Sequence, residues 1–287
     1  MLATSALLLC SCSNQPSTCA TDTGEESVRT LDDLSSAQLR LFLKGLAGDW
    51  RANTAQNRGE PAPPVQQPIP KDARLIDLPT PSDITAGTMP LAQAVKQRRS
   101  HREYSTATLT SEELSFLLWC TQGVSSFEQD AEGAITSQFR TVPSGGSRHP
   151  FETYLVVNRV EGLEPGLYRF LPFGHKLCLL RATNDLSPQL QQACYGQGFV
   201  GEAAVTFIWS AIPRRTEWKY GCIAHRIIAM EAGHICQNLY LASESIGAGA
   251  CAVLGYSQPH IDALIGVDGQ DAFVIYMAAV GKKLADE

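Results

Sequence analysis

The chain has 287 residues and a formal net charge of −6, and hydrophobic residues make up 44% of it. This length and composition exclude a peptide or a disulfide-stapled mini-domain, and they predict one large domain with an extension. The acidic balance, without a basic tract, argues against a nucleic-acid partner. No apolar run reaches the roughly 18 residues that a transmembrane helix needs.

The first residues resemble a targeting segment. Residues 2–9 form a short apolar run, and Leu9-Cys10-Ser11-Cys12 is loosely similar to a bacterial lipobox in which Cys12 would be lipidated. No basic residue precedes Arg29. We therefore separate residues 1–28 from the fold as a candidate signal or lipoprotein segment. Both export with an anchor in a bacterial periplasm and a cytoplasmic location stay open.

Residues 29–73 are predicted to form an extension arm. Apolar residues in 35–46 recur at helical spacing, and the following stretch over 58–90 is rich in proline. Proline at this density prevents a helix or a central strand. We expect an extended arm that wraps over the domain or over a partner subunit.

Residues 74–287 are predicted to form one α+β domain. Helical patterns begin at Pro90, at a Thr110–Glu113 capping box, and over residues 187–194 and 222–246. Apolar or alternating runs predict strands at residues 151–158, 166–172, 176–181, 203–211 and 273–282. Because strands and helices do not alternate strictly, an α+β arrangement is favoured.

Two segments carry residues suited to binding an anion or a flat ring. Arg98–Arg102 (RRSHR) offers three guanidinium groups and a hydroxyl for a phosphate, or else forms a solvated basic turn that ends the helix from Pro90. Pro143–Pro150 (PSGGSRHP) has two adjacent glycines that expose backbone N–H groups, or else is a tight loop leading into a strand.

Two further segments are open to a catalytic or a structural interpretation. Lys219 and Tyr220 can relay protons if burial or a nearby charge lowers their pKa, or they are a surface amine beside a packed ring. Gly247–Ala252 matches a dinucleotide fingerprint only formally, because it follows a helix. It is interpreted as a helix C-cap or as a backbone turn packed on a flat ligand. The histidines lack HxxxH or HExxH spacing, so no metal site is predicted.

These motifs together resemble a known superfamily. RRSHR, PSGGSRHPFETYLVV, GLYRF, WKYG, GHICQNLYLA, GAGACAV and VGK are similar to the nitroreductase-like flavoproteins, and more specifically to the SagB-type (ThcOx-like) dehydrogenases, over about residues 74–283. The resemblance implies a three-layer α+β fold whose mostly antiparallel central sheet is flanked by helices. It also implies a domain-wrapped homodimer with two FMN sites at the subunit interface.

The resemblance also implies roles for single residues. On the phosphate and ribityl chain of FMN it places Arg98, Arg99, Ser100 and Arg102, with Lys282 reaching the phosphate. Beside the isoalloxazine it places Pro143, Ser144, Gly145, Gly146 and Ser147, and on a backbone turn near N5 and O4 it places Gly249 and Ala250. The Lys-x-Arg ending of many nitroreductases is not kept, since Lys283 and Leu284 follow Lys282.

The expected function is an FMN-dependent dehydrogenase. It would oxidise an azoline or a similar C–N or C–C unit with hydride transfer to flavin N5, with Lys219 and Tyr220 as base and relay. One alternative is an NAD(P)H-dependent nitro or quinone reductase, and another is a non-catalytic flavin-binding partner subunit. The substrate, the electron partner and the direction of the reaction stay open.

Overall fold

A computed structural model describes residues 33–44, 50–133 and 135–284. The candidate signal segment, residues 1–28 with Cys12, lies outside the described residues. Within the described part no helix is long and apolar enough to cross a membrane.

The centre of the molecule is a seven-stranded sheet in which every pair of neighbouring strands is antiparallel. Its order is β1 (Arg74–Asp77), β6 (Lys176–Ala182), β5 (Gly166–Leu171), β4 (Phe151–Val157), β7 (Val205–Ala211), β9 (Phe273–Lys282) and β8 (Ala248–Val253). A separate two-stranded ribbon pairs β2 (Val124–Gln129) with β3 (Ile135–Arg140). The strands expected from the sequence are confirmed, and so is the α+β class with a mostly antiparallel sheet.

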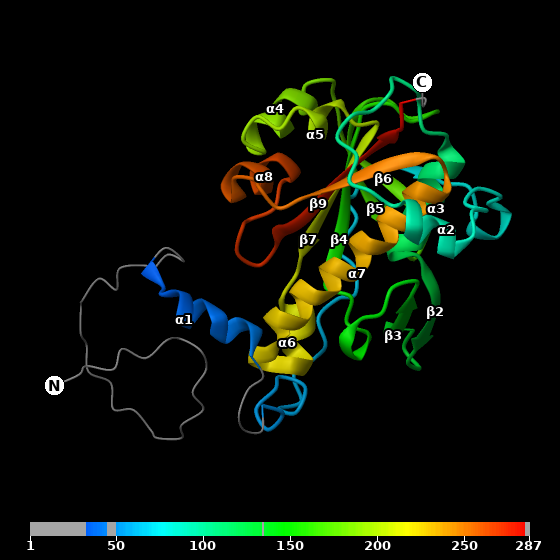
Figure 1. The fold of residues 1–287 in the computed structure, drawn as a ribbon. Coiled ribbons are helices and arrows are strands. Elements are labelled where there is room, and N and C mark those ends of the chain that lie inside the picture. Colours follow the sequence, from blue (N-terminus) through cyan, green and yellow to red (C-terminus); the bar gives the residue numbers. More distant parts are fainter. Residues whose placement is uncertain (1–32, 45–49, 134, 285–287) are drawn as a thin grey trace.

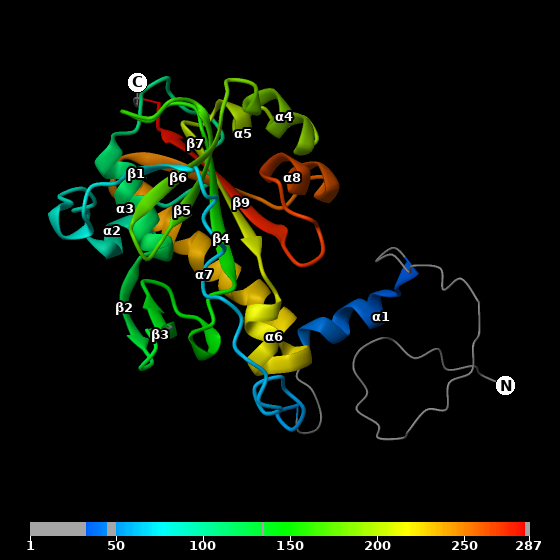
Figure 2. The same cartoon turned by 180° about the vertical axis from the view of Figure 1, so that it is seen from behind.

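Helices cover both faces of this sheet (Figures 1 and 2). The helices are α1 (Ser36–Leu39), α2 (Leu91–Gln97), α3 (Ser111–Gln122), α4 (Leu186–Ala193), α5 (Phe199–Glu202), α6 (Arg214–Tyr220), α7 (Ala224–Ser245) and α8 (Gln258–Ile265). Single turns of 3-10 helix occur at Arg40–Leu43, Pro81–Asp83, Gly145–Ser147 and Gly221–Ile223. One layer holds α3 and the long α7, and the opposite layer holds α4, α5 and α8.

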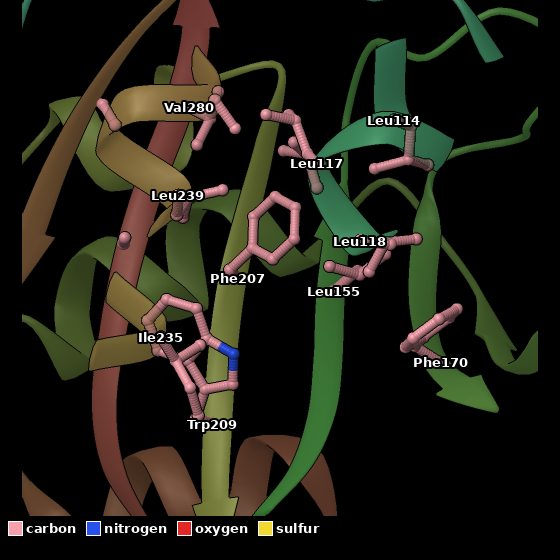
Figure 3. Packing of buried hydrophobic residues seen from close by; sticks show 14 of the residues in the cluster. Leu114, Leu117, Leu118, Leu155, Phe170, Phe207, Trp209, Ile235, Leu239 and Val280 are labelled. Carbon is pink, nitrogen blue, oxygen red and sulfur yellow. The ribbon is translucent and has the colours of Figure 1, made fainter. Parts of the chain in front are cut away.

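Alternation along the strands produces two apolar cores, one on each face of the sheet. On β4, Leu155 packs under α7 and α3, whereas Val156 packs toward α4 and α8. The same alternation on β7 sends Phe207 to the first core and Ile208 to the second. Figure 3 shows the first core, where Phe207 lies between side chains of α7 and side chains of α3. The sheet is therefore buried on both sides, and the ends of its strands are the places left for a site.

The capping box predicted at Thr110 is present. Thr110 Oγ1 accepts the Glu113 N–H at 3.1 Å, and Glu113 Oε2 accepts the Thr110 N–H at 2.9 Å. This reciprocal pair fixes the first turn of α3.

At the C-terminal end of α7, Gly247 has φ +69, a conformation that glycine adopts without strain and that lets the chain reverse into β8.

The proline-rich arm runs over its own domain. It follows the sheet face that carries α4, α5 and α8 (Figure 2), and the backbone of Pro64, Gln67 and Pro68 is bonded to side chains of this chain. The proline-rich stretch continues past the arm into one strand, β1, which lies at the edge of the sheet, where proline-rich chain is tolerated. Of the two predicted positions for the arm, the structure describes the one over its own domain.

Two predicted elements differ in the structure. The helix from Pro90 ends at Gln97, so Arg98–Arg102 is extended chain and not the last helical turn. Gly249 and Ala250 lie inside β8 and not in a turn. Ser100 and His101 pair with Ala250 of β8, which holds this segment extended. Gly249 and Ala250 are strand residues because β8 pairs along its length with β9.

Candidate functional site

The first group of predicted residues gathers at one end of the sheet, where the segment after α2 pairs with β8. The His101 N–H donates to the Ala250 carbonyl at 3.0 Å, and Ser100 and Ala250 form a parallel bridge. We call Arg98, Ser100, His101, Gly249, Ala250 and Lys283 the strand-end cluster. Two stretches separated by about 150 positions thus become neighbours through backbone bonds.

Glycine is required at position 249 by this close approach. A Cβ atom at position 249 would lie 2.6 Å from Cβ of His101, well inside van der Waals contact. A second glycine, Gly281, makes room in the same way for Tyr104 on the same segment. Gly249 therefore has a packing role in this chain, which the sequence pattern alone did not reveal.

Tyr240 of α7 organises the polar side chains of the strand-end cluster. Its hydroxyl lies 3.0 Å from Oγ of Ser100 and accepts the Ala252 N–H at 2.8 Å, and the Arg98 guanidinium stacks 5.3 Å from its ring centre. Arg102 points further along, 5.8 Å from the ring centre of Phe199. Tyr240 was missed by sequence reasoning, although it lies within the GHICQNLYLA motif.

Arg99 differs from its neighbours in the RRSHR motif. It is exposed, and its guanidinium turns back to the carbonyls of Lys96 and Arg98 at 3.2 and 2.8 Å. It therefore caps the end of α2 and stays apart from the strand-end cluster.

The two lysines at the end of β9 point to opposite sides. Lys282 forms an ion pair with Glu113 and donates to the Ile246 carbonyl at 3.1 Å. Lys283 pairs with the buried Glu244 at 2.5 Å and is close enough to His101 to lower its pKa. Side chains alternate along an extended chain. Lys283 therefore faces the strand-end cluster, and the contact of Lys282 with a phosphate stays a prediction.

The strand-end cluster has a donor set that suits an anion. Arg98 and Lys283 supply cations, and Ser100 supplies a hydroxyl. Burial, and after it the charge of Lys283, lowers the pKa of His101, so its ring is neutral at neutral pH. The buried Nε2 atom of His101 has no hydrogen-bond partner within the described residues.

A second group of predicted residues gathers around the PSGG loop. Glu231, buried on α7, accepts the Gly145 N–H at 2.6 Å and the Ser144 hydroxyl at 2.8 Å. Ser144 Oγ also accepts the His149 N–H at 2.9 Å, which closes the loop on itself. Pro143 is exposed at the start of this loop, and Ser147 bonds to the backbone of Gln138.

Lys219 and Tyr220, at the end of α6, pack onto this loop. A Cβ atom at Gly146 would lie 2.5 Å from Cδ of Lys219, and one at Gly145 would lie 3.4 Å from the Tyr220 ring. Gly146 also has φ +57, which favours glycine. We call Ser144, Gly145, Gly146, Lys219, Tyr220 and Glu231 the loop cluster.

Two groups of the loop cluster have shifted pKa values. Burial, with a further contribution from Glu231, raises the pKa of Tyr220, while Arg148 opposes this change. Burial also raises the pKa of Glu231, although the bonds from Gly145 and Ser144 favour its charged form. Tyr220 is therefore a protonated phenol at neutral pH, able to donate a hydrogen bond. Glu231 is the functional candidate that sequence reasoning missed, because only the fold brings α7 to the loop.

The two clusters lie apart on a single chain. Both contact α7, one at Glu231 and the other at Tyr240, and nine helical residues span about 13 Å. Within each cluster the structure brings the predicted residues together. It does not join Lys219 and Tyr220 to Arg98, Ser100 or Lys282 in one chain.

The fold is an antiparallel sheet between two helical layers, and both clusters contact its long helix α7. The model of the nitroreductase family matches residues 95–282, which include the loop cluster and all of the strand-end cluster except Lys283. A Methanocaldococcus jannaschii protein named Putative nitroreductase MJ1384 is 32% identical over 194 residues, which cover 68% of this chain and 91% of that protein. The chain belongs to the nitroreductase family and is an oxidoreductase. This family generally binds flavin.

Two more distant similarities are to a protein named for trifolitoxin processing and to a chain of a microcin synthetase. The trifolitoxin-processing protein TfxB of Rhizobium leguminosarum is 25% identical over 146 residues, which cover 48% of this chain and 39% of TfxB. The Escherichia coli microcin synthetase McbBCD, with truncated pro-MccB17 bound, contains a chain that is 18% identical with a TM-score of 0.54. The match covers 91% of this chain and 86% of that one, and it shows a shared fold.

Proposed function

We propose that the protein is an FMN-dependent dehydrogenase of the SagB type, which oxidises an azoline or a similar C–N or C–C unit of a peptide. The observation that carries the proposal is the loop cluster, where Lys219 and Tyr220 lie against a glycine loop held by a buried carboxyl group. The names of TfxB and of the microcin synthetase, both from peptide modification, support a peptide substrate.

The strand-end cluster is the proposed site for the phosphate and ribityl chain of FMN. Arg98, Ser100 and Lys283 of this cluster offer charged and hydroxyl donors, and Arg102 lies further along the same segment. Each terminal lysine already pairs with a carboxylate, Lys282 with Glu113 and Lys283 with Glu244. The flat glycine surface of the PSGG loop is the proposed support for the ring. When bound, FMN would supply the acceptor for one hydride equivalent, which carries two electrons.

The distance between the clusters favours a homodimer. The exposed face of α7, on the side of Tyr240, has small residues, Ala229 and Gly233, and the adjacent Met230 is 58% exposed. On the neighbouring α2, Leu91 is 68% and Val95 is 55% exposed. A second copy packed on this apolar face would cover it and bring the loop cluster of one chain toward the strand-end cluster of the other.

The proposed proton chemistry rests on two neighbours with different tasks. Tyr220 keeps its proton at neutral pH because its pKa is raised, so it can orient or protonate a substrate atom. Lys219, over Gly146, is the proposed base that takes the proton from the carbon or nitrogen being oxidised. Glu231 accepts hydrogen bonds from the loop and so fixes the surface on which Lys219 and Tyr220 pack.

The second candidate is an NAD(P)H-dependent nitro or quinone reductase. The observation that favours it is the 32% identity with a protein named a nitroreductase, which exceeds the identity with the peptide-processing relatives. Both candidates use the same proposed FMN site. They differ in whether a nicotinamide or a peptide delivers the electrons.

The test uses the purified full chain. We expect absorbance near about 450 nm from bound flavin, loss of that band under anaerobic mixing with an azoline peptide, and slow or no loss with NADPH. Rapid bleaching by NADPH would replace the dehydrogenase by the reductase. A colourless protein that FMN cannot restore would reject both.

A double variant tests for a non-catalytic flavin-binding subunit. Lys219→Ala with Tyr220→Phe should retain the flavin band and lose turnover. Unchanged turnover would show that the pair is structural.

A further inference from the structure

The arm segment of residues 56–68, here called the strap, bonds to α6, the helix that carries Lys219 and Tyr220. Trp218 Nε1 donates to the Glu60 carbonyl at 2.8 Å, and the Gln56 N–H donates to the Trp218 carbonyl at 2.9 Å. These bonds link positions about 160 residues apart. The strap thus grips the residue directly before the proposed base.

A buried ion pair ties the middle of the strap to the same helix. Arg215 and Glu152 are 1% and 4% exposed, and Arg215 Nη2 lies 2.6 Å from Glu152 Oε1. Arg215 Nε donates to the Pro64 carbonyl at 2.8 Å, and Glu152 Oε1 accepts the Gln67 N–H at 2.9 Å. A buried pair adds little stability by itself because desolvation offsets the attraction. Here each partner uses a further hydrogen bond to hold the strap.

The same two residues of α6 also contact the chain that leads out of the PSGG loop. Arg148 Nε donates to the Arg215 carbonyl at 3.1 Å, and its guanidinium stacks 4.8 Å from the ring centre of Trp218. Trp218 therefore lies between the strap and Arg148. A shift of the strap would be transmitted to the loop cluster through this one side chain.

Helix α6 depends on these contacts for its position. It has seven residues, its N-cap is Pro213, and no side-chain hydrogen bond caps that end. Isolated helices of this length are marginal in water, so tertiary contacts decide where it lies. Lys219 follows Arg215 by four residues, which places the two on the same side of the helix.

We propose that the strap is a positioning element of the active site, which acts through Trp218 and Arg215 to hold Lys219 and Tyr220 against the Ser144–Gly146 loop. The catalytic part of this proposal rests on the function proposed above. Trp218, Arg215 and Glu152 are positioning residues, and the loop cluster carries the chemistry.

The test compares Trp218→Phe with a control on the same arm. Trp218→Phe keeps an aromatic ring for Arg148 but removes the Nε1–H donor to Glu60. Arg74→Ala breaks an exposed ion pair with Glu164, at 2.5 Å, far along the arm from α6. Hydrogen exchange followed by mass spectrometry measures opening of residues 214–220 and 144–147 in the wild type and in both variants.

We expect faster exchange in both segments for Trp218→Phe and unchanged exchange for Arg74→Ala. Turnover by Trp218→Phe should fall about tenfold or more, because small misplacements of catalytic groups are costly. The pH profile of kcat should shift, while the flavin affinity stays the same. A role in stability alone would lower Tm and leave kcat and its pH profile unchanged.

Unchanged exchange in residues 214–220 overturns the positioning role. Faster exchange with unchanged kcat also overturns it, because the strap would then hold a helix that turnover does not need. The exchange measurement needs neither substrate nor flavin. If the wild type proves colourless and inactive, the proposed function fails separately, and exchange in residues 144–147 still decides whether the strap positions the loop. Glu152→Gln, which removes the charge at the other anchor, should reproduce the result if Trp218→Phe does not fold.

Discussion

The strand-end cluster and the loop cluster contact the same helix but are held in different ways. Backbone bonds between residues 98–101 and β8 build the first, and its cations remain at least partly exposed. A buried side chain, Glu231, builds the second by accepting two hydrogen bonds from the loop. One region therefore depends on how closely two backbones approach, and the other depends on hydrogen bonds and protonation.

This difference separates the two functions proposed for the clusters. Changes that obstruct backbone packing should affect cofactor retention, whereas changes in the loop should affect turnover.

Gly249→Ala should have the largest effect. Its Cβ would lie 2.6 Å from Cβ of His101, an atom close to the backbone that cannot swing away. We expect a loss of about 1–3 kcal/mol in unfolding free energy, typical of overpacking, and flavin loss on gel filtration. Gly174→Ala, whose Cβ would meet Lys176 at an ordinary 3.6 Å, is the matched control. Full flavin retention by Gly249→Ala would refute the packing argument.

Gly146→Ala should reduce turnover while the flavin stays bound. Position 146 has φ +57, which costs about 1–2 kcal/mol for alanine, and the new methyl group would displace Lys219. We expect kcat to fall about 10²-fold, the size of a lost general base. Gly145→Ala, with its nearest contact at 3.2 Å from Ile227, should be much milder. Equal effects at both glycines would contradict the assignment of Lys219.

Acid should destabilise the loop region through His149. Burial lowers its pKa from 6.5 to about 3, so the native ring stays neutral where the unfolded ring gains a proton. The free energy of unfolding that the neutral His149 ring contributes is fully present above pH 6.5. It declines as the pH falls, by up to about 1.4 kcal/mol per pH unit. Urea unfolding at several pH values should show a flatter slope for His149→Gln. The exposed His260→Gln should keep the wild-type slope.

The two terminal lysines should differ in their effect on the flavin. Lys283 faces the strand-end cluster, so Lys283→Met should weaken flavin binding about fivefold, the size of one partly exposed charge contact. Lys282→Met should leave flavin binding nearly unchanged. Both variants should lower Tm, because Glu113 or the buried Glu244 loses its partner. Flavin titration by fluorescence measures both. A larger loss of flavin affinity in Lys282→Met than in Lys283→Met would support Lys282 as the residue that reaches the phosphate, as the family resemblance implies.

The regular elements followed from local pattern, whereas α6 did not. The strand at Phe151–Val157 and the helix at Ala224–Ser245 have apolar residues at the expected period. Helix α6 mixes charged residues with Trp218, and its position depends on a strap more than 150 residues away. A sequence window contains no information about such a partner.

The candidate site was predictable only in part, because some of its residues are recognised by their type and others only by their contacts with distant segments. Arg98, Ser100, Lys219 and Tyr220 stood out because their residue types suit anion binding or proton transfer. Glu231 and Lys283 did not stand out, since a carboxyl group in a helix and a second terminal lysine are common. They were selected by hydrogen bonds and by the side of the chain on which they lie.

The sequence by itself determined the class of fold, the positions of the main strands and helices, and the motifs of the nitroreductase family. These depend on the spacing of apolar residues and on short local motifs. The tertiary structure decided that RRSHR is extended along β8, that Lys283 faces the strand-end cluster, and that the arm grips α6. Each of these outcomes depends on contacts between distant segments, and such contacts exist only once the sheet has brought those segments together.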